Sequence, residues 1–190
     1  IEASAEAGNI GAITLSATGA GTDIRLAAYD YFAMNEAGTA AVGGVVGDVK
    51  VTATGIGSYA YVDLWSTSMD YDGNALANTG IGNVAITMSG AGSAADVEAY
   101  ADYGSLKNIT VSMAGAKSIY RGDFYALGNI GNVAITQTGV ASDTDTYLKA
   151  DADLDGADTV AGGVIGTIGL SVNGLGASGY VEAEAYGSLN

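Results

Sequence analysis

The chain has 190 residues, 30 of them glycine, and contains no proline, cysteine or histidine. The lack of cysteine and histidine excludes disulfides, thiol nucleophiles, imidazole bases and zinc sites built from these residues. Six basic residues against 21 acidic ones give a net charge of -15, which disfavours nucleic acids and anionic lipid surfaces as partners.

A twelve-residue phrase occurs six times along the chain, and its opening occurs once more near the C-terminus. The copies begin at Gly8, Gly44, Thr79, Gly104, Gly128 and Gly163, and the seventh opening is GSLN from Gly187. Their spacing indicates a unit of about 24 residues that carries an insert of about 11 residues in three places. A repeat of this length predicts stacked copies of one supersecondary unit, each covering the apolar face of its neighbour.

The second half of each phrase alternates apolar and polar residues, as at Ile13 and Leu15 or at Val84 and Ile86. Period-two alternation predicts a strand with one buried face. Each phrase then closes with a glycine followed by small residues, and glycine supplies the positive φ that a tight turn needs. A turn is therefore predicted after each of these first strands.

A second alternating segment follows each turn, for example DIRLAAYDY from Asp23 and DVEAYADY from Asp96. Apolar residues such as Leu26 and Val97 are expected inside. The charged residues expected outside are Arg25, Asp63, Glu98, Asp123, Lys149, Glu182 and Glu184. The pattern predicts an all-β fold, a β-solenoid of about six two-strand coils in one repeat domain over residues 1–190. The alternative is an antiparallel β-sandwich of hairpins, because alternation alone does not separate the two.

The three inserts follow second strands, so we expect three insert loops on one edge of the solenoid. Two inserts carry closely spaced oxygen ligands before a glycine, an arrangement in which carboxylates converge on a hard cation such as calcium. The candidate ligands are Asp151, Asp153, Asp155 and Asp158 in one insert and Asp70, Asp72 and Asn74 in another. The first run resembles the calcium loops of EF-hand and dockerin-type modules over its first six positions, but Gly162 stands at the twelfth. An acidic, solvated turn is the alternative interpretation.

The outward residues are also compatible with two other functions. An outward ladder of four acidic residues on the second strands, Asp63, Glu98, Asp123 and Glu182, raises the alternative of a polysaccharide-cleaving enzyme, since glycosidases use pairs of carboxylates. A ladder of like charges on an exposed sheet face is more often a solubilising surface, and the chain is not expected to be an enzyme. Threonines at nearly equivalent positions of the first strands would suit an ice-binding face, which is a further, weaker alternative. They are Thr14, Thr52, Thr87, Thr110 and Thr136.

The phrase GNIGNVAITQTG and its siblings cover essentially the whole chain. They resemble the repeats of bacterial secreted β-strand-repeat surface proteins, such as adhesins, surface-layer proteins and extracellular fibres. The resemblance implies a secreted, extracellular or cell-surface location and a structural or adhesive role, often with calcium. It transfers no functional residue beyond the candidate calcium ligands.

The N-terminal segment IEASAEAG is similar to VEAEAYG near the C-terminus, so both ends show the same phase of the repeat. The chain starts at Ile1 rather than methionine, and we expect a processed form or a fragment. Because uncapped repeat ends expose unpaired backbone groups, we expect copies of the chain to stack end to end as a homopolymer. The predicted interface comprises Ile1, Glu2, Ala3, Ala5, Val181, Ala183, Ala185 and Leu189.

The function expected from this stacking is that of a structural subunit of an extracellular filament, sheath or surface array. The alternative is an adhesin stalk or a module that binds glycans or proteins. Neither nucleic acid nor membrane insertion is expected, because the surface is acidic and no apolar run is long enough to span a bilayer.

Overall fold

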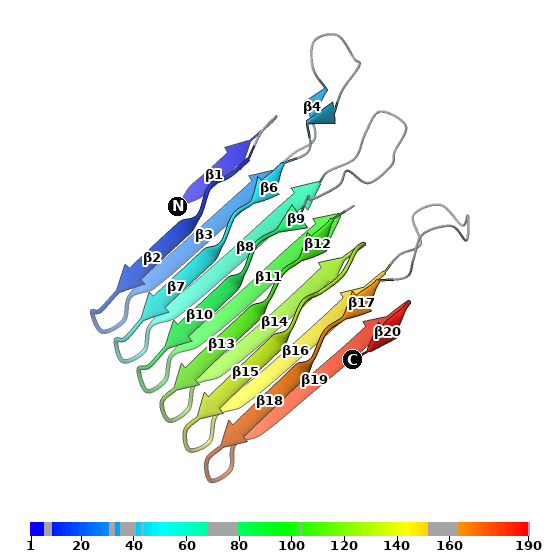
Figure 1. Cartoon of the computed structure of the whole chain (residues 1–190). Helices are drawn as coiled ribbons and strands as arrows, with labels where there is room; N and C mark the ends of the chain where they lie inside the picture. Colours follow the sequence, from blue (N-terminus) through cyan, green and yellow to red (C-terminus); the bar gives the residue numbers. More distant parts are fainter. Residues whose placement is uncertain are drawn as a thin grey trace.

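The computed structural model describes residues 1–5, 9–30, 33–34, 41–42, 44–67, 80–102, 104–151 and 163–189. Like strands of successive coils pair in parallel and in register, and the coils stack side by side from one terminus to the other (Figure 1). The predicted β-solenoid is therefore confirmed. Within the described residues, antiparallel pairing is confined to β4 (Ala33–Met34) and β5 (Ala41–Val42), so the alternative sandwich of hairpins is wrong for this part of the chain.

The first strands of the phrases form a six-stranded sheet. Its members are β2 (Ile13–Ala17), β7 (Val49–Ala53), β10 (Val84–Met88), β13 (Ile109–Ala114), β15 (Val133–Thr138) and β18 (Ile168–Asn173). The second strands form a seven-stranded sheet. Its members are β1 (Glu2–Ala5), β3 (Asp23–Asp30), β8 (Tyr59–Thr67), β11 (Ala94–Asp102), β14 (Ile119–Ala126), β16 (Asp143–Ala150) and β19 (Ser178–Ala185).

Among the described residues, most coils also contain a short third strand that the alternation pattern did not predict. These strands are β6 (Val45–Val46), β9 (Gly80–Ile81), β12 (Ser105–Leu106), β17 (Val164–Ile165) and β20 (Ser188–Leu189). Isolated parallel bridges at Ile10 and Ile130 occupy the same place in their coils. Two residues are too few to show an alternation, which explains why the sequence pattern missed them.

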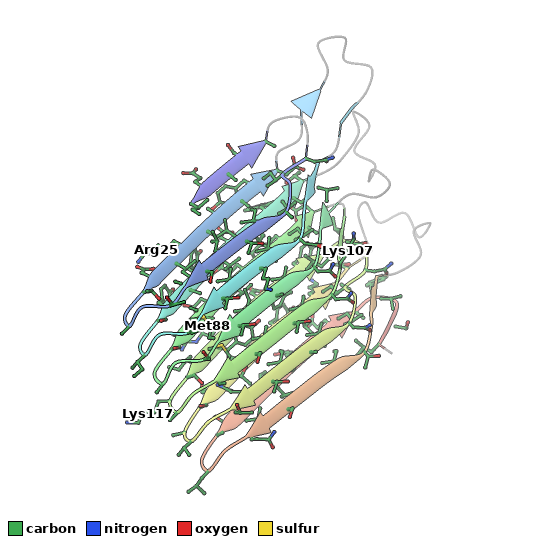
Figure 2. The ribbon with its side chains drawn as sticks, turned by 60° about the vertical axis from the view of Figure 1, so that its left-hand side comes forward. Arg25, Met88, Lys107 and Lys117 are labelled. Carbon is green, nitrogen blue, oxygen red and sulfur yellow. The ribbon has the colours of Figure 1, made fainter. Side chains whose placement is uncertain are left out.

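The hydrophobic core lies between the two long sheets, where alternate residues of each strand point inward. Val51, Ile86, Leu64 and Val97 are at most 1% exposed, and each such side chain contributes about 1.5–3 kcal/mol through burial. Side chains fill the space between the sheets in Figure 2, with Lys117 at the edge formed by the turns. In the terminal coils the corresponding residues are only partly buried, because one neighbour is missing. They are Ile13, Leu15, Ile24, Ile168, Val181 and Ala183.

The glycines that close the second to sixth phrases are required by the close stacking of the coils, and Gly115 and Gly174 also have a positive φ, of 154° and 156°. A Cβ at Gly55 would lie 1.8 Å from the carbonyl oxygen of Gly19, and one at Gly90 would lie 1.8 Å from that of Gly55. The left-handed φ of the turn falls two residues later, at 64° for Gly21 and 66° for Gly57. The turn was predicted correctly, but the residue with a φ between 54° and 69° follows the closing glycine, and the closing glycine itself has a positive φ only at Gly115 and Gly174.

The three long connections all leave the end of a strand of the seven-stranded sheet and return to a short strand. They join β3 to β6, β8 to β9 and β16 to β17. Equivalent strand ends stack in a parallel solenoid, so the described strand ends that flank the inserts share one edge, opposite the turns (Figure 1). This part of the prediction is confirmed by the described strands that flank each insert.

Candidate functional site

The outer face of the seven-stranded sheet carries a column of three acidic residues. Asp63 of β8, Glu98 of β11 and Asp123 of β14 are register partners on neighbouring strands. Adjacent strands of a sheet lie about 4.8 Å apart. Glu182, predicted as the fourth member, lies in the same column but is separated from Asp123 by Tyr147. The structure therefore brings three of the four predicted acidic residues together.

Glu98 is the central carboxyl of this column and has an unusual environment. Desolvation by burial is the first cause that raises its pKa above the ordinary glutamate value, and repulsion from Asp63, Asp123 and Asp96 adds to it. Both effects disfavour the charged form of the carboxyl. Glu98 consequently keeps its proton to a higher pH than an isolated glutamate.

A column of aromatic residues runs beside the acidic one. Tyr29, Trp65, Tyr100 and Tyr125 occupy consecutive strands in register. The rings of Trp65 and Tyr100 have centroids 5.9 Å apart and an interplanar angle of 42°. Aromatic pairs in this arrangement add to the stability of a sheet.

Hydrogen bonds join the two columns across successive coils. The hydroxyl of Tyr29 donates to Asp63 of the next coil, and the hydroxyl of Tyr100 donates to Asp123 at 2.9 Å. Trp65 Nε1 likewise donates to Asp102 at 2.9 Å. Two of the three column carboxylates therefore link coils, and the aromatic residues hold acidic side chains that would otherwise repel one another.

A shallow hollow of about 370 Å³ opens on the same face, at the coils of β11, β14 and β16. The side chains that line it are Tyr61, Asp96, Glu98, Arg121, Asp123, Asp145 and Tyr147. Carboxylates, tyrosine hydroxyls and one guanidinium give it the hydrogen-bonding groups that hydroxyl-rich ligands use. The hollow is wide and open to solvent, so it is a surface for contact more than an enclosed pocket.

The outer face of the six-stranded sheet differs sharply in chemistry. One complete column consists of small hydroxyl residues, Ser16, Thr52, Thr87, Ser112, Thr136 and Ser171. The predicted threonine row is therefore divided, since Thr14 and Thr110 lie in the adjacent column with Lys50, Ala85 and Ala134. The five threonines therefore do not share one position, because register places three of them in the first column and two in the second.

The predicted interface residues lie at the two opposite ends of the stack. Ile1, Glu2, Ala3 and Ala5 lie in β1 or next to it, whereas the others lie in β19 and β20. The members of the second set are Val181, Ala183, Ala185 and Leu189. Ile1 is 71% exposed and Leu189 is 56% exposed. A hollow of about 220 Å³ at the first end is lined by Ile1, Leu15 and Ile24, together with Ser16, Asp23 and Arg25.

Of the candidate calcium ligands, only Asp151 belongs to the described residues, and its carboxylate lies 3.3 Å from Lys149 Nζ. Asp153, Asp155, Asp158, Asp70, Asp72 and Asn74 lie outside the described residues. Within the part of the chain that the structure describes, no group of three or more acidic residues is placed to hold a metal ion. Calcium binding stays a prediction.

Two buried polar features were not anticipated from the sequence. Asp30 is completely buried at a position where the paired strands carry Ala5 and Ser66. Gln137, Thr144 and Thr146 are buried together in one coil. A polar residue at an inward position of a strand is the signal that could have identified them. The inward positions are certain only once the register of the strands is known.

No helix among the described residues combines the length and the apolar character required to cross a membrane. Comparison of the chain with protein-family models, with curated proteins and with solved structures found no match.

Proposed function

We propose that the protein is a structural subunit of an extracellular filament, sheath or surface array whose copies stack end to end. The observation that carries the proposal is that the two terminal coils are exposed on their outer sides. Each has edge strands with free hydrogen-bonding positions, and its inward residues, such as Leu15 and Leu170, are not fully covered. Leu170 is 38% exposed, whereas its register partner Ile135 is 1% exposed.

Register supports pairing of β19 with β1 of the next copy. Within one molecule Glu2, Ala3 and Ala5 share columns with Glu182, Ala183 and Ala185. Addition of β1 to β19 would therefore continue the alternation, with Ala3 facing inward beside Ala183. Backbone pairing at an exposed sheet edge together with apolar burial is the β-augmentation mode of association.

The strand counts specify what such a junction looks like. The seven-stranded sheet has one strand more than the six-stranded sheet. A junction that pairs β19 with β1 leaves β18 and the next copy's β2 two strand spacings apart, about 10 Å. The proposed junction is therefore continuous in one long sheet and one strand short in the other. Glu182 and Glu2 would also become neighbours, so we expect assembly to strengthen with added salt.

The first prediction concerns removal of β1. Deletion of residues 1–7 should abolish end-to-end assembly, because it removes the edge strand that pairs with β19. Leu170→Asp should have the same effect by placing a charge at the apolar end of the stack. Negative-stain microscopy and sedimentation velocity over a range of protein concentrations measure the outcome.

A matched control is Ile56→Asp, since Ile56 is 68% exposed at a turn away from both ends of the stack. This variant should assemble like the parent chain. Appending the sequence of residues 108–115 after Asn190 supplies the missing strand of the six-stranded sheet and should lower the concentration needed for assembly. Filaments formed by the deletion variant, or isolated monomers at high concentration of the parent chain, would contradict the proposal.

We also propose that the acidic inserts bind calcium, through Asp151, Asp153, Asp155 and Asp158 and through Asp70, Asp72 and Asn74. The supporting argument is the spacing of oxygen ligands before a glycine in a chain of net charge -15. Excess calcium should raise Tm by several degrees relative to the chelator-treated protein. Asp155→Asn combined with Asp153→Asn should reduce that rise, and an unchanged Tm in calcium would refute the site.

The second candidate function is a surface module that binds glycans, and the polar hollow on the outer face of the seven-stranded sheet favours it. Its carboxylates and tyrosine hydroxyls match the hydroxyl groups of a sugar chain. Isolated rods in micrographs, together with retention on immobilised polysaccharides, would support this function over end-to-end assembly.

A further inference from the structure

The coil formed by β15 and β16 has a polar interior. Gln137, Thr144 and Thr146 point inward and are at most 1% exposed. The register partners of Gln137 are Met113 and Val172, and Thr146 pairs with Val181. Polar residues thus replace apolar ones at several inward positions of a single coil.

Tyr120 of β14 extends this polar interior into the preceding coil. It is completely buried, and its register partner on β16 is Thr144. Its ring lies over Gly122, since a Cβ at Gly122 would be 2.4 Å from the Tyr120 hydroxyl. Gly122 is itself the register partner of Thr146. The Tyr120 hydroxyl therefore lies at the level of Thr146, one strand away.

Gln137 is held in a fixed orientation beside the same strands. Its Nε2 donates to the carbonyl oxygens of Ser118 at 3.0 Å and of Asp143 at 2.9 Å. Ser118 immediately precedes β14, and Asp143 begins β16. With both amide hydrogens used in this way, Oε1 is left as an acceptor in the core.

Four buried side-chain oxygens of this region have no hydrogen-bond partner among the residues that the structure describes. They are Tyr120 Oη, Gln137 Oε1, Thr144 Oγ1 and Thr146 Oγ1, named below as the polar core cluster. Buried polar atoms without partners are strongly disfavoured, and internal water is the usual partner where several lie together. Three hydroxyls that donate and one amide oxygen that accepts are complementary to water, which does both.

We propose that the polar core cluster binds internal water between β14, β15 and β16. A water there accepts from up to two of the hydroxyls and donates to Gln137 Oε1, so that it joins two successive coils at a place where apolar packing is interrupted. Burial raises the pKa of Tyr120 well above that of free tyrosine, so its hydroxyl remains a donor at any physiological pH. The site is independent of end-to-end assembly and of the inserts.

A high-resolution crystal structure of the parent chain and of Thr146→Val tests the proposal. We expect at least one ordered water within hydrogen-bond distance of two or more oxygens of the polar core cluster. Thr146→Val keeps the side-chain shape but removes one hydroxyl, and it should lose or displace that water. The matched control is Thr136→Val, whose hydroxyl lies on the exposed outer face of β15 and whose substitution should leave the water in place.

Thermal melting gives the second measurement. If water is bound, Thr146→Val should lower Tm, because the remaining oxygens of the cluster lose a bridging partner. The proposal is overturned if the cluster oxygens bond one another directly, if fewer than two of them contact a water, or if Thr146→Val raises Tm. A higher Tm would show that no water is bound and that the buried Thr146 hydroxyl only destabilises the parent chain.

Discussion

Gly90→Ala should lower the free energy of unfolding by at least about 3 kcal/mol, or prevent folding altogether. The added Cβ would lie 1.8 Å from the carbonyl oxygen of Gly55 and 2.4 Å from its carbonyl carbon. These are backbone atoms of the preceding coil, so no side-chain rotation relieves the overlap. Two stacked turns would have to separate, and the parallel ladders on both sides would be disturbed. Urea unfolding followed by circular dichroism measures the change.

Gly92→Ala provides the matched control, two residues further along the same turn. Gly92 has a left-handed φ of 66°, but nothing lies within 4 Å of a Cβ built there. The expected cost is about 1–2 kcal/mol, from backbone strain alone. Equal losses for the two variants would show that conformation, and not the close stacking of coils, makes glycine necessary at position 90.

This pair also shows what the sequence could and could not reveal about the fold. The period of the repeat and the alternation of its strands predict parallel stacking, because each inward residue is repeated in the next coil. The identity of the left-handed residue is less accessible, since Lys117 and Ala141 occupy that position with φ of 56° and 54°. The residue type does not identify this left-handed position in every turn. The position is identified by its equivalence to Gly21 and Gly57 in the stacked coils.

The candidate surfaces were predictable only in part, because their arrangement also depends on the register between strands. Which residues face outward follows from alternation, and the acidic residues of β8, β11 and β14 were predicted there. Their neighbours across strands depend on register, which the inserts obscure. The cross-coil bonds from Tyr29 to Asp63 and from Tyr100 to Asp123 could therefore not be derived from spacing along the chain.

Asp30→Ala should stabilise the protein at neutral and alkaline pH. Asp30 is completely buried, and desolvation raises its pKa from 3.8 to about 6, although a hydrogen bond from the Gly44 backbone partly favours the charged form. The same inward column carries Ala101, Ala126 and Ala150 in later coils, so alanine suits the position. Thermal melting and urea unfolding between pH 4 and pH 8 measure the effect.

The sign of the pH dependence follows from linkage. Because the pKa of Asp30 is higher in the folded than in the unfolded chain, the folded state holds more protons between about pH 4 and pH 6. The contribution of this residue to stability is therefore lost as pH rises through that window, and the penalty is complete above it, at about 1–3 kcal/mol. The advantage of Asp30→Ala over the parent chain should grow with pH and level off near pH 7.

Asp145→Ala is the matched control, since it removes one negative charge from the outer face of the same sheet without touching the core. General relief of charge repulsion would stabilise both variants alike, whereas burial of a carboxylate singles out Asp30. If the two variants gain equally, the burial argument fails. If Asp30→Ala alone gains, and its gain grows between about pH 4 and pH 6, burial of this inward carboxylate makes the solenoid more stable in acid.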